Sequence, residues 1–320
     1  MRNRLIALLA AGLLAAALPA QAQDYPAKPI RIVVPLAAGG GTDVLARVIA
    51  GKLSTRFGQP VTVENRTGAA GNIGAEVVFR APPDGYTLMF TQPGPLVVNK
   101  ALYGKIGFEP DQFVPVALVS LQDIMLAVNP KVPAQTLQEL IAYARANPDK
   151  LNYGSSGAGS APHLAAELFK SMAHVKMVHV PYKGSAESMN ATLGGQVDLT
   201  FFAFSSALPN ARAGRLRAIA VGGTHRNPQL PDVPAIAEAL PGYSAASWTA
   251  LVAPPGTPPA IANKLAQAVA EIVKEPDVHK RMIDAGDEAL TSTPEEMAKF
   301  LSEESKRWSA LIQAEGIKAE

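Results

Sequence analysis

The sequence contains no cysteine among its 320 residues, which excludes disulfide bonds. The stability of the fold must therefore come from the burial of apolar groups. A chain of about 300 residues buries roughly three quarters of the surface that its unfolded state exposes. The chain is thus long enough to stabilise itself by burial, and this length is typical of one large or two modest domains.

Long apolar runs are also scarce. The one long run, residues 5–18, has about 14 residues and is too short to span a bilayer. It follows a short cationic start with Arg2 and Arg4, and the small-x-small pattern at 20–22 follows it. This arrangement predicts a cleavable signal peptide over residues 1–22 and a periplasmic location for the mature chain. The alternative is an uncleaved N-terminal anchor.

The chain has no large excess of charge of either sign. Loss of Arg2 and Arg4 with the signal peptide lowers the count of basic side chains from 29 to 27, which equals the 27 acidic ones. A net charge near zero argues against nucleic acid or an anionic membrane as the partner.

Strand-like and helix-like segments alternate along the chain, which predicts the α/β class. The largely apolar run Ile30–Pro35, which includes one charged residue, Arg31, is typical of a parallel strand that is covered on both faces. Capping boxes at 136–139 and 293–296 predict two helix starts. We expect strands at 30–35, 61–64, 86–90, 151–154, 177–180, 197–202 and 216–221, helices at 43–57 and in the segment before Pro82, and a largely helical region at 258–320.

Two segments, 125–130 and 247–259, are predicted to cross between two lobes. The second contains a proline-rich stretch, and proline limits how far such a segment can flex. A chain that leaves one lobe and later returns forms a two-lobed protein with a cleft. We expect lobe 1 to comprise 23–125 plus 249–320 and lobe 2 to comprise 126–248.

Three loops rich in glycine and serine precede predicted helices, at 36–43, 154–163 and 180–185. Helix N-termini attract anions because they present unpaired N–H groups and a partial positive charge. Glycine lets an anion approach these groups closely. The glycines could instead serve tight packing alone, but the division of the loops between the two lobes favours a ligand held from both sides.

The loops favour a carboxylate over a phosphate. The dinucleotide fingerprint fails because Val44 stands at its third glycine position, and no Gly-Lys-Ser/Thr of a P-loop is present. The loops contain no arginine, and Lys183 is their only cation. A carboxylate matches backbone N–H groups and hydroxyls better than a dense phosphate charge does.

Catalytic and metal-binding patterns are weak. The segment 154–158 lacks the final glycine of a nucleophile elbow, because Ala158 stands there. The five histidines form no metal-ligand motif, so we expect no metal site and no cofactor. Asp43 is interpreted as a helix cap. An exported hydrolase that uses Ser156 or Ser160 remains an alternative.

Several motifs together resemble one family: VVPLAAGGGTD, VENRTGAAGNIGAE, APPDGYTL, LNYGSSGAGSAPHLAAELFK, VPYKG, GQVDLTF and SWTALVAPPGTP. The chain resembles the periplasmic solute-binding proteins of tripartite tricarboxylate transporters, the TctC/Bug family. The resemblance implies a two-lobed Venus flytrap of the type II periplasmic-binding-protein fold with two crossover strands. It also implies a monomeric receptor that is not an enzyme, binds a small organic carboxylate in the cleft and delivers it to inner-membrane permease subunits.

The resemblance also implies the ligand-binding residues. These are Ala38, Gly39, Thr42 and Asp43 in the first loop, Ser156, Gly157, Ser160 and His163 in the second, and Tyr182, Lys183, Gly184 and Asp198 in lobe 2.

The pair Gln122-Asp123 departs from the family pattern. If Asp123 faces the cleft, it repels a second ligand carboxylate; otherwise it is a solvated acid at a strand end. A receptor for a signalling kinase, or for an ATP-driven importer of an oxyanion, remains an alternative to a transporter receptor.

Overall fold

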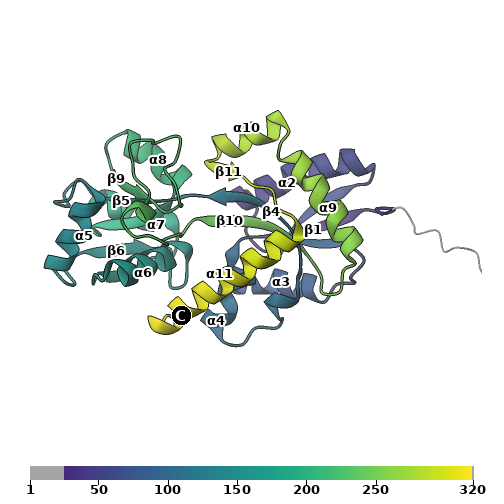
Figure 1. Ribbon diagram of the computed structural model, residues 1–320, viewed down its shortest axis with the longest axis horizontal. Coiled ribbons are helices and arrows are strands. Elements are labelled where there is room, and N and C mark those ends of the chain that lie inside the picture. The colour runs from purple at the N-terminus through teal and green to yellow at the C-terminus, as the bar shows by residue number, and fades with distance from the viewer. Residues whose placement is uncertain (1–24, 319–320) are drawn as a thin grey trace, which may run out of the picture.

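The computed structural model describes residues 25–318 and contains two mixed β-sheets, each covered by helices (Figure 1). The first sheet has the strand order β11-β4-β10-β3-β1-β2. Strands β1, β2 and β3 run parallel, whereas β10 runs antiparallel to both β3 and β4. The strands are β1 (Ile30–Val34), β2 (Val61–Asn65), β3 (Thr87–Thr91), β4 (Val114–Gln122), β10 (Ser247–Ala253) and β11 (Asp287–Ala289).

The second sheet has the order β7-β6-β8-β5-β9. Its strands β6, β7 and β8 are parallel, and β5 is antiparallel to β8 and β9. The strands are β5 (Ile124–Val128), β6 (Asn152–Ser155), β7 (Val178–Pro181), β8 (Leu199–Ala203) and β9 (Arg217–Val221).

The chain crosses between the sheets twice. Strand β4 ends at Gln122 in the first sheet and β5 begins at Ile124 in the second, so Asp123 alone joins them. On the return, Ala245 N–H still donates to the carbonyl of Gly222, which directly follows β9 of the second sheet, whereas β10 belongs to the first sheet. The two-lobed α/β fold with two crossover strands is confirmed. We propose lobe boundaries at these crossings, within three residues of the division expected from the sequence.

Side chains of β1 point alternately to the two faces of the sheet, and both faces are buried, as expected for a covered strand. Ile30, Ile32 and Val34 pack with helices α2 (Gly41–Phe57), α9 (Pro259–Ile272) and α10 (Pro276–Asp284). Val33 belongs to the cluster on the other face, with α3 (Asn72–Phe79) and α11 (Pro294–Ala314). The remaining helices are α4 (Asn99–Tyr103), α5 (Leu137–Ala146), α6 (Ala161–Ala173), α7 (Ser185–Gly194) and α8 (Phe204–Arg212).

The predicted strands are all present, with ends shifted by one or two residues. The box at Thr293 is complete, whereas at Thr136 the carboxylate of Glu139 accepts from Gln135 N–H and not from Thr136 N–H. Strand β11 was not predicted, because its three residues lie in a charged, helix-like context. The predicted signal peptide lies outside the described residues.

Candidate functional site

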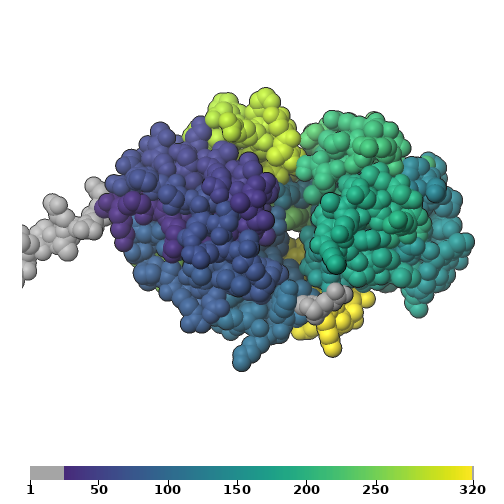
Figure 2. All heavy atoms as spheres, turned by 180° about the vertical axis from the view of Figure 1, so that it is seen from behind, coloured from purple at the N-terminus to yellow at the C-terminus, as the bar shows by residue number. Residues whose placement is uncertain are grey.

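A cavity of about 620 Å³ lies between the two lobes, within the size range of small-molecule sites. Figure 2 shows the hollow between the purple and blue surface of lobe 1 and the green surface of lobe 2. Five loops that precede helices meet there, together with both crossover segments. Its lining comprises residues 35–37, 67–68, 70–71, 91–95, 98–99, 122–124, 156, 159–162, 164, 185, 203, 245–247 and 308.

The loop between β6 and α6 lines the cavity from lobe 2. Gly157 and Gly159 have φ of 113° and 72°, which only glycine adopts without strain. The Ser160 hydroxyl donates to the Gly157 carbonyl at 2.7 Å and makes no cap to the helix. No side chain therefore caps the first turn of α6, and this end of the helix faces the cavity through Ser160 and Ala161.

His163 supports this loop from behind the cavity and is not among the lining residues. Its Nδ1 accepts from Gly159 N–H at 2.9 Å, which requires this nitrogen to be unprotonated. Its ring stacks on His179 with the centroids 4.0 Å apart, and His179 in turn contacts the Ser155 hydroxyl at 2.6 Å. Burial lowers the pKa of His163, which stabilises the neutral form that the Gly159 contact needs.

The loop between β7 and α7 borders the cavity beside the α6 loop. Tyr182 N–H donates to the Ser155 carbonyl, so the two loops are joined. Gly184 is the N-cap of α7 and has no side chain that could cap the helix. The next residue, Ser185, lines the cavity. Tyr182, Lys183 and Gly184 themselves are not lining residues, so their contact with ligand stays a prediction.

The first predicted loop meets the cavity through Pro35, Leu36 and Ala37, one step before the predicted residues. Ala38 and Gly39 are exposed and do not line the cavity, and their role in binding stays a prediction.

Asp43 is buried at the start of α2, where it takes hydrogen bonds from within the protein. Its carboxylate accepts from Gly39 N–H at 2.8 Å and from Asn65 at 2.9 Å, and it pairs with Arg47 at 3.0 Å. The hydrogen bond from Arg47 is the largest reason that the pKa of Asp43 is lowered to about 2. Asp43 therefore supplies its own negative charge to the N-terminus of α2.

Thr42 is the predicted residue of this loop that keeps an open hydrogen-bonding group. It is 3% exposed, and its hydroxyl has no partner among the described residues. Buried hydroxyls are nearly always hydrogen-bonded, so a ligand or water that reaches Thr42 would complete it.

Two lining loops in lobe 1, at 67–71 and 91–99, were not predicted as sites. Gly68, Ala69, Ala70 and Gly71 all have positive φ, and the two alanines store strain of the kind found at functional sites. The glycine-rich strand-to-helix pattern of this loop is the same signal that identified the other three loops. It would have pointed to this loop as well.

Asp198 lies away from the cavity, contrary to the expectation that it faces the cleft. It precedes β8, whose other end, Ala203, lines the cavity. Its carboxylate accepts from Asn152 N–H at 2.9 Å. The carboxylate therefore joins the starts of the inner strands β6 and β8, at the end of these strands away from the cavity.

Asp123 lies at the first crossover and borders the cavity from the hinge side. Its carboxylate accepts from its neighbour Ile124 N–H at 2.8 Å and from Gly223 N–H at 2.9 Å. Burial raises its pKa. Asp123 is thus a partly buried acid at the crossover, bonded within the protein, and not a solvated acid at a strand end.

The geometry gives no support to serine hydrolysis in the described part of the chain. The Ser160 hydroxyl donates to the Gly157 carbonyl, and the Nδ1 atom of His163, which begins the same helix, accepts from Gly159 N–H. The serine that does contact a histidine, Ser155, is fully buried. Residues 25–318 contain no cluster of three potential metal ligands.

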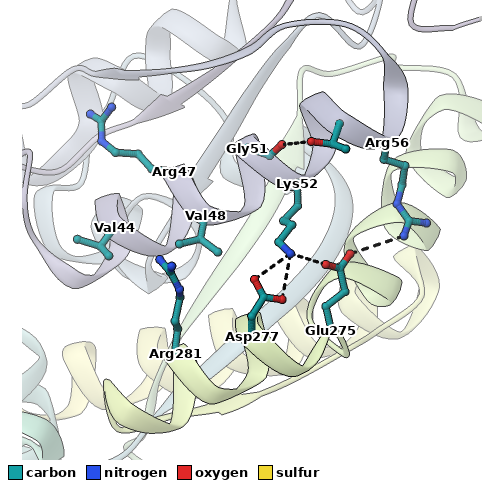
Figure 3. Close-up of a pocket in the computed structure, with 10 residues that line it drawn as sticks. Val44, Arg47, Val48, Gly51, Lys52, Arg56, Glu275, Asp277 and Arg281 are labelled. Carbon is teal, nitrogen blue, oxygen red and sulfur yellow. Dashed lines mark hydrogen bonds and ion pairs between the residues drawn. The ribbon is translucent and has the colours of Figure 1, made fainter.

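A larger hollow of about 880 Å³ lies on the outer face of lobe 1, between α2 and α10 (Figure 3). Its charged side chains pair mainly with one another: Lys52 contacts Glu275 at 2.6 Å and Asp277 at 2.9 Å, and Arg56 reaches Glu275. No residue of lobe 2 lines it. The cavity between the lobes is therefore the better candidate for a ligand that both lobes hold.

Comparison with known proteins identifies the family of the chain. The family model described as "Tripartite tricarboxylate transporter family receptor" matches residues 45–317. Protein BugT of Bordetella pertussis is 35% identical over 305 residues, covering 94% of both chains.

Two solved structures from Rhodopseudomonas palustris have the same fold. Rpa4515 with adipate is 37% identical with a TM-score of 0.78 and covers 93% of this chain and 100% of its own. MatC with bound malate is 34% identical with a TM-score of 0.73 and covers 90% and 100%.

Within residues 25–318, no helix is long and apolar enough to cross a membrane. The matches cover nearly the whole chain, and they confirm the periplasmic-binding-protein fold and the receptor class. The chain thus belongs to the TctC/Bug family of solute-binding receptors, whose members are not enzymes.

Proposed function

We propose that this protein is a periplasmic receptor that binds a small carboxylate between its lobes and delivers it to the permease of a tripartite transporter. The observation that carries the proposal is the cavity between the lobes, where the uncapped start of α6 meets loops of lobe 1. The adipate and malate named for the two Rhodopseudomonas structures are carboxylates of the expected size.

Binding between the lobes gives the receptor two states that a permease can distinguish. A ligand favours the closed state only as far as it binds that state more tightly than the open one. Contacts from both lobes supply this difference. The protein is proposed to act as a monomer, since the cavity is complete within one chain.

A thermal-shift screen of mono-, di- and tricarboxylates tests binding. A ligand at 100 times its Kd adds about 2.7 kcal/mol to the free energy of unfolding. Unchanged melting temperatures across the panel at millimolar concentrations would contradict the proposal. Sulfate and phosphate belong in the panel, because preference for them would favour an oxyanion receptor.

Delivery to a permease needs its own measurement. Deletion of the gene should abolish uptake of the radiolabelled ligand identified by the screen, and expression of the receptor should restore it. Uptake that continues without the receptor, while a transcriptional response to the ligand is lost, would indicate a signalling receptor instead.

A further inference from the structure

We infer that His163 and His179 are positioning residues for the bound carboxylate, because each of the two stacked rings fixes one glycine of the loop that precedes α6. These glycines are Gly159 and Gly157, which both have positive φ. The inference rests on the proposed function, since it concerns the affinity for the same acid. Neither ring is among the described residues that line the cavity, so both act through the loop and not by touching the ligand.

His163 holds Gly159 through a single hydrogen bond. Its Nδ1 accepts from Gly159 N–H at 2.9 Å, so the neutral ring must carry its proton on Nε2. The Nε2 atom lies 3.7 Å from the Glu167 carboxylate, whose negative charge favours the proton on that side of the ring. The tautomer that the loop needs is therefore selected by an acid one turn further along the same helix.

Glu167 is itself buried and held by two neighbours. It accepts a hydrogen bond from the Tyr153 hydroxyl and pairs with Lys170 at 2.7 Å. The rings of Tyr153 and His179 stack with that of His163. Among residues 25–318, the titratable groups that face His163 are thus Tyr153 from β6, His179 from β7, and Glu167 and Lys170 from α6. Burial lowers the pKa of His163, so the ring is neutral at pH 7.5.

His179 holds Gly157 through one intermediate group, the Ser155 hydroxyl. The Nε2 atom of His179 contacts Ser155 Oγ at 2.6 Å, and Gly157 N–H donates to the same oxygen at 3.1 Å. Ser155 is fully buried, so this bridge is shielded from water. The two glycines of the loop therefore each have a support that begins at a histidine ring.

The stack of the two rings joins the two supports. The centroids of His163 and His179 lie 4.0 Å apart and the rings are 7° from parallel, so the position of one ring limits that of the other. The loop before α7 is tied to the same structure, because Tyr182 N–H donates to the Ser155 carbonyl. A carboxylate that meets these loops finds groups that are already in place, and binding then costs less ordering of the loop.

Replacement of His163 by asparagine or leucine tests the first support. Asparagine places its Oδ1 acceptor where Nδ1 stands, whereas leucine fills the space without an acceptor. In isothermal titration calorimetry at pH 7.5, we expect His163→Asn to bind adipate within about threefold of wild type and His163→Leu to bind it about tenfold more weakly, as the loss of one buried hydrogen bond allows. Malate serves as the probe if adipate gives no heat with the wild type.

A merely structural role of His163 would affect the two folded variants alike, so equal affinities of His163→Asn and His163→Leu would overturn the inference. His174→Asn is the matched control. His174 is the exposed C-cap of the same helix, with a φ of 53° that asparagine tolerates, and this variant should bind as the wild type does.

The tautomer of His163 tests the contact without any acid. In protein labelled with nitrogen-15 at histidine, long-range proton–nitrogen correlation spectra at pH 7.5 distinguish the two neutral tautomers. We expect the proton on Nε2. A proton on Nδ1, or a charged ring, would overturn the inference, because neither form accepts from Gly159. If no acid of the panel binds the wild type, the proposed function fails, whereas the tautomer still decides whether His163 holds Gly159.

Ser155→Ala and His179→Leu test the second support. Each removes one end of the bridge to Gly157 and should weaken adipate binding by about threefold to tenfold. The double variant should bind no more weakly than the weaker single variant, because both changes act on one bridge. Losses that multiply in the double variant, or no loss in either single variant, would overturn this part of the inference. Should one of these variants not fold, the other still tests the bridge.

Discussion

Replacement of Asp43 by asparagine tests whether this residue serves the fold or the ligand. Asp43 is 2% exposed and bonds to Gly39, Asn65 and Arg47, so the predicted ligand contact is occupied by the protein's own groups. We expect Asp43→Asn to lower the free energy of unfolding and to leave carboxylate affinity unchanged or higher. Affinity can rise because the substitution removes a negative charge from the neighbourhood of the cleft.

The magnitude follows from the pKa of Asp43, which is lowered from 3.8 to about 2. A shift of this size corresponds to about 2 kcal/mol of stability at neutral pH. Arg47 is half exposed, and solvent screens the pair, so we expect a loss of about 1–2 kcal/mol. Because the pKa is lower in the folded state, this stability is present above pH 4 and is lost as the pH falls toward 2.

Urea denaturation followed by circular dichroism, at pH 7, 5 and 3.5, measures this effect. The difference between wild type and Asp43→Asn should be full at pH 7 and 5 and smaller at pH 3.5. Asp284→Asn removes an exposed partner of Lys280 and is the matched control, with an expected loss under about 0.5 kcal/mol. Unchanged stability at pH 7 combined with a tenfold loss of carboxylate binding would refute the reasoning and make Asp43 a ligand contact.

Three further substitutions test other parts of the site. Thr42→Val should leave the unliganded protein as stable as wild type or up to about 1 kcal/mol more stable, because the Thr42 hydroxyl has no partner among the described residues. A weaker carboxylate affinity of this variant in calorimetry would show that the hydroxyl contacts the ligand. Gly159→Ala should weaken binding tenfold or more, because the φ of Gly159 is 72° and an added Cβ would lie 2.1 Å from the side chain of Leu102 in lobe 1. The second substitution Leu102→Ala, made in the Gly159→Ala protein, should restore part of the affinity. If it does not, the proposed clash is wrong. Asp287→Asn should raise the free energy of unfolding by about 1–2 kcal/mol at pH 7, because burial raises the pKa of Asp287 to about 6 and the ionised form destabilises the fold as the pH rises through 6. In chemical denaturation, this gain in stability should vanish near pH 4, where the carboxyl group is protonated in the folded protein. A gain that persists at pH 4 would have another cause.

The sequence by itself determined the α/β class and most of the strand positions. Hydrophobic runs, capping boxes and glycines report the local conformation of the residues that carry them, and these signals need no distant partner. The sequence placed Ser156 and Ser160 in a loop between a strand and a helix, and both line the cavity. The missing side-chain cap of α6 is seen only in the structure, because Ser160 stands at the N-cap position but its hydroxyl bonds to Gly157. Strand β11 was not predicted, because a strand of three residues in a charged segment is too short to show the two-residue hydrophobic period of a strand.

The tertiary structure alone decided which helix ends remain open to a ligand. Asp43 is the last residue of the first loop, yet only the fold brings Asn65 beside it, so that the Asp43 carboxylate is paired within the protein. Asp198 lies in a motif that the resemblance assigned to the ligand site, but it is placed at the end of β8 away from the cavity. Local pattern fixes the conformation of a loop, whereas the partners of its polar groups depend on segments that are distant in sequence, and these partners determine what the loop can bind.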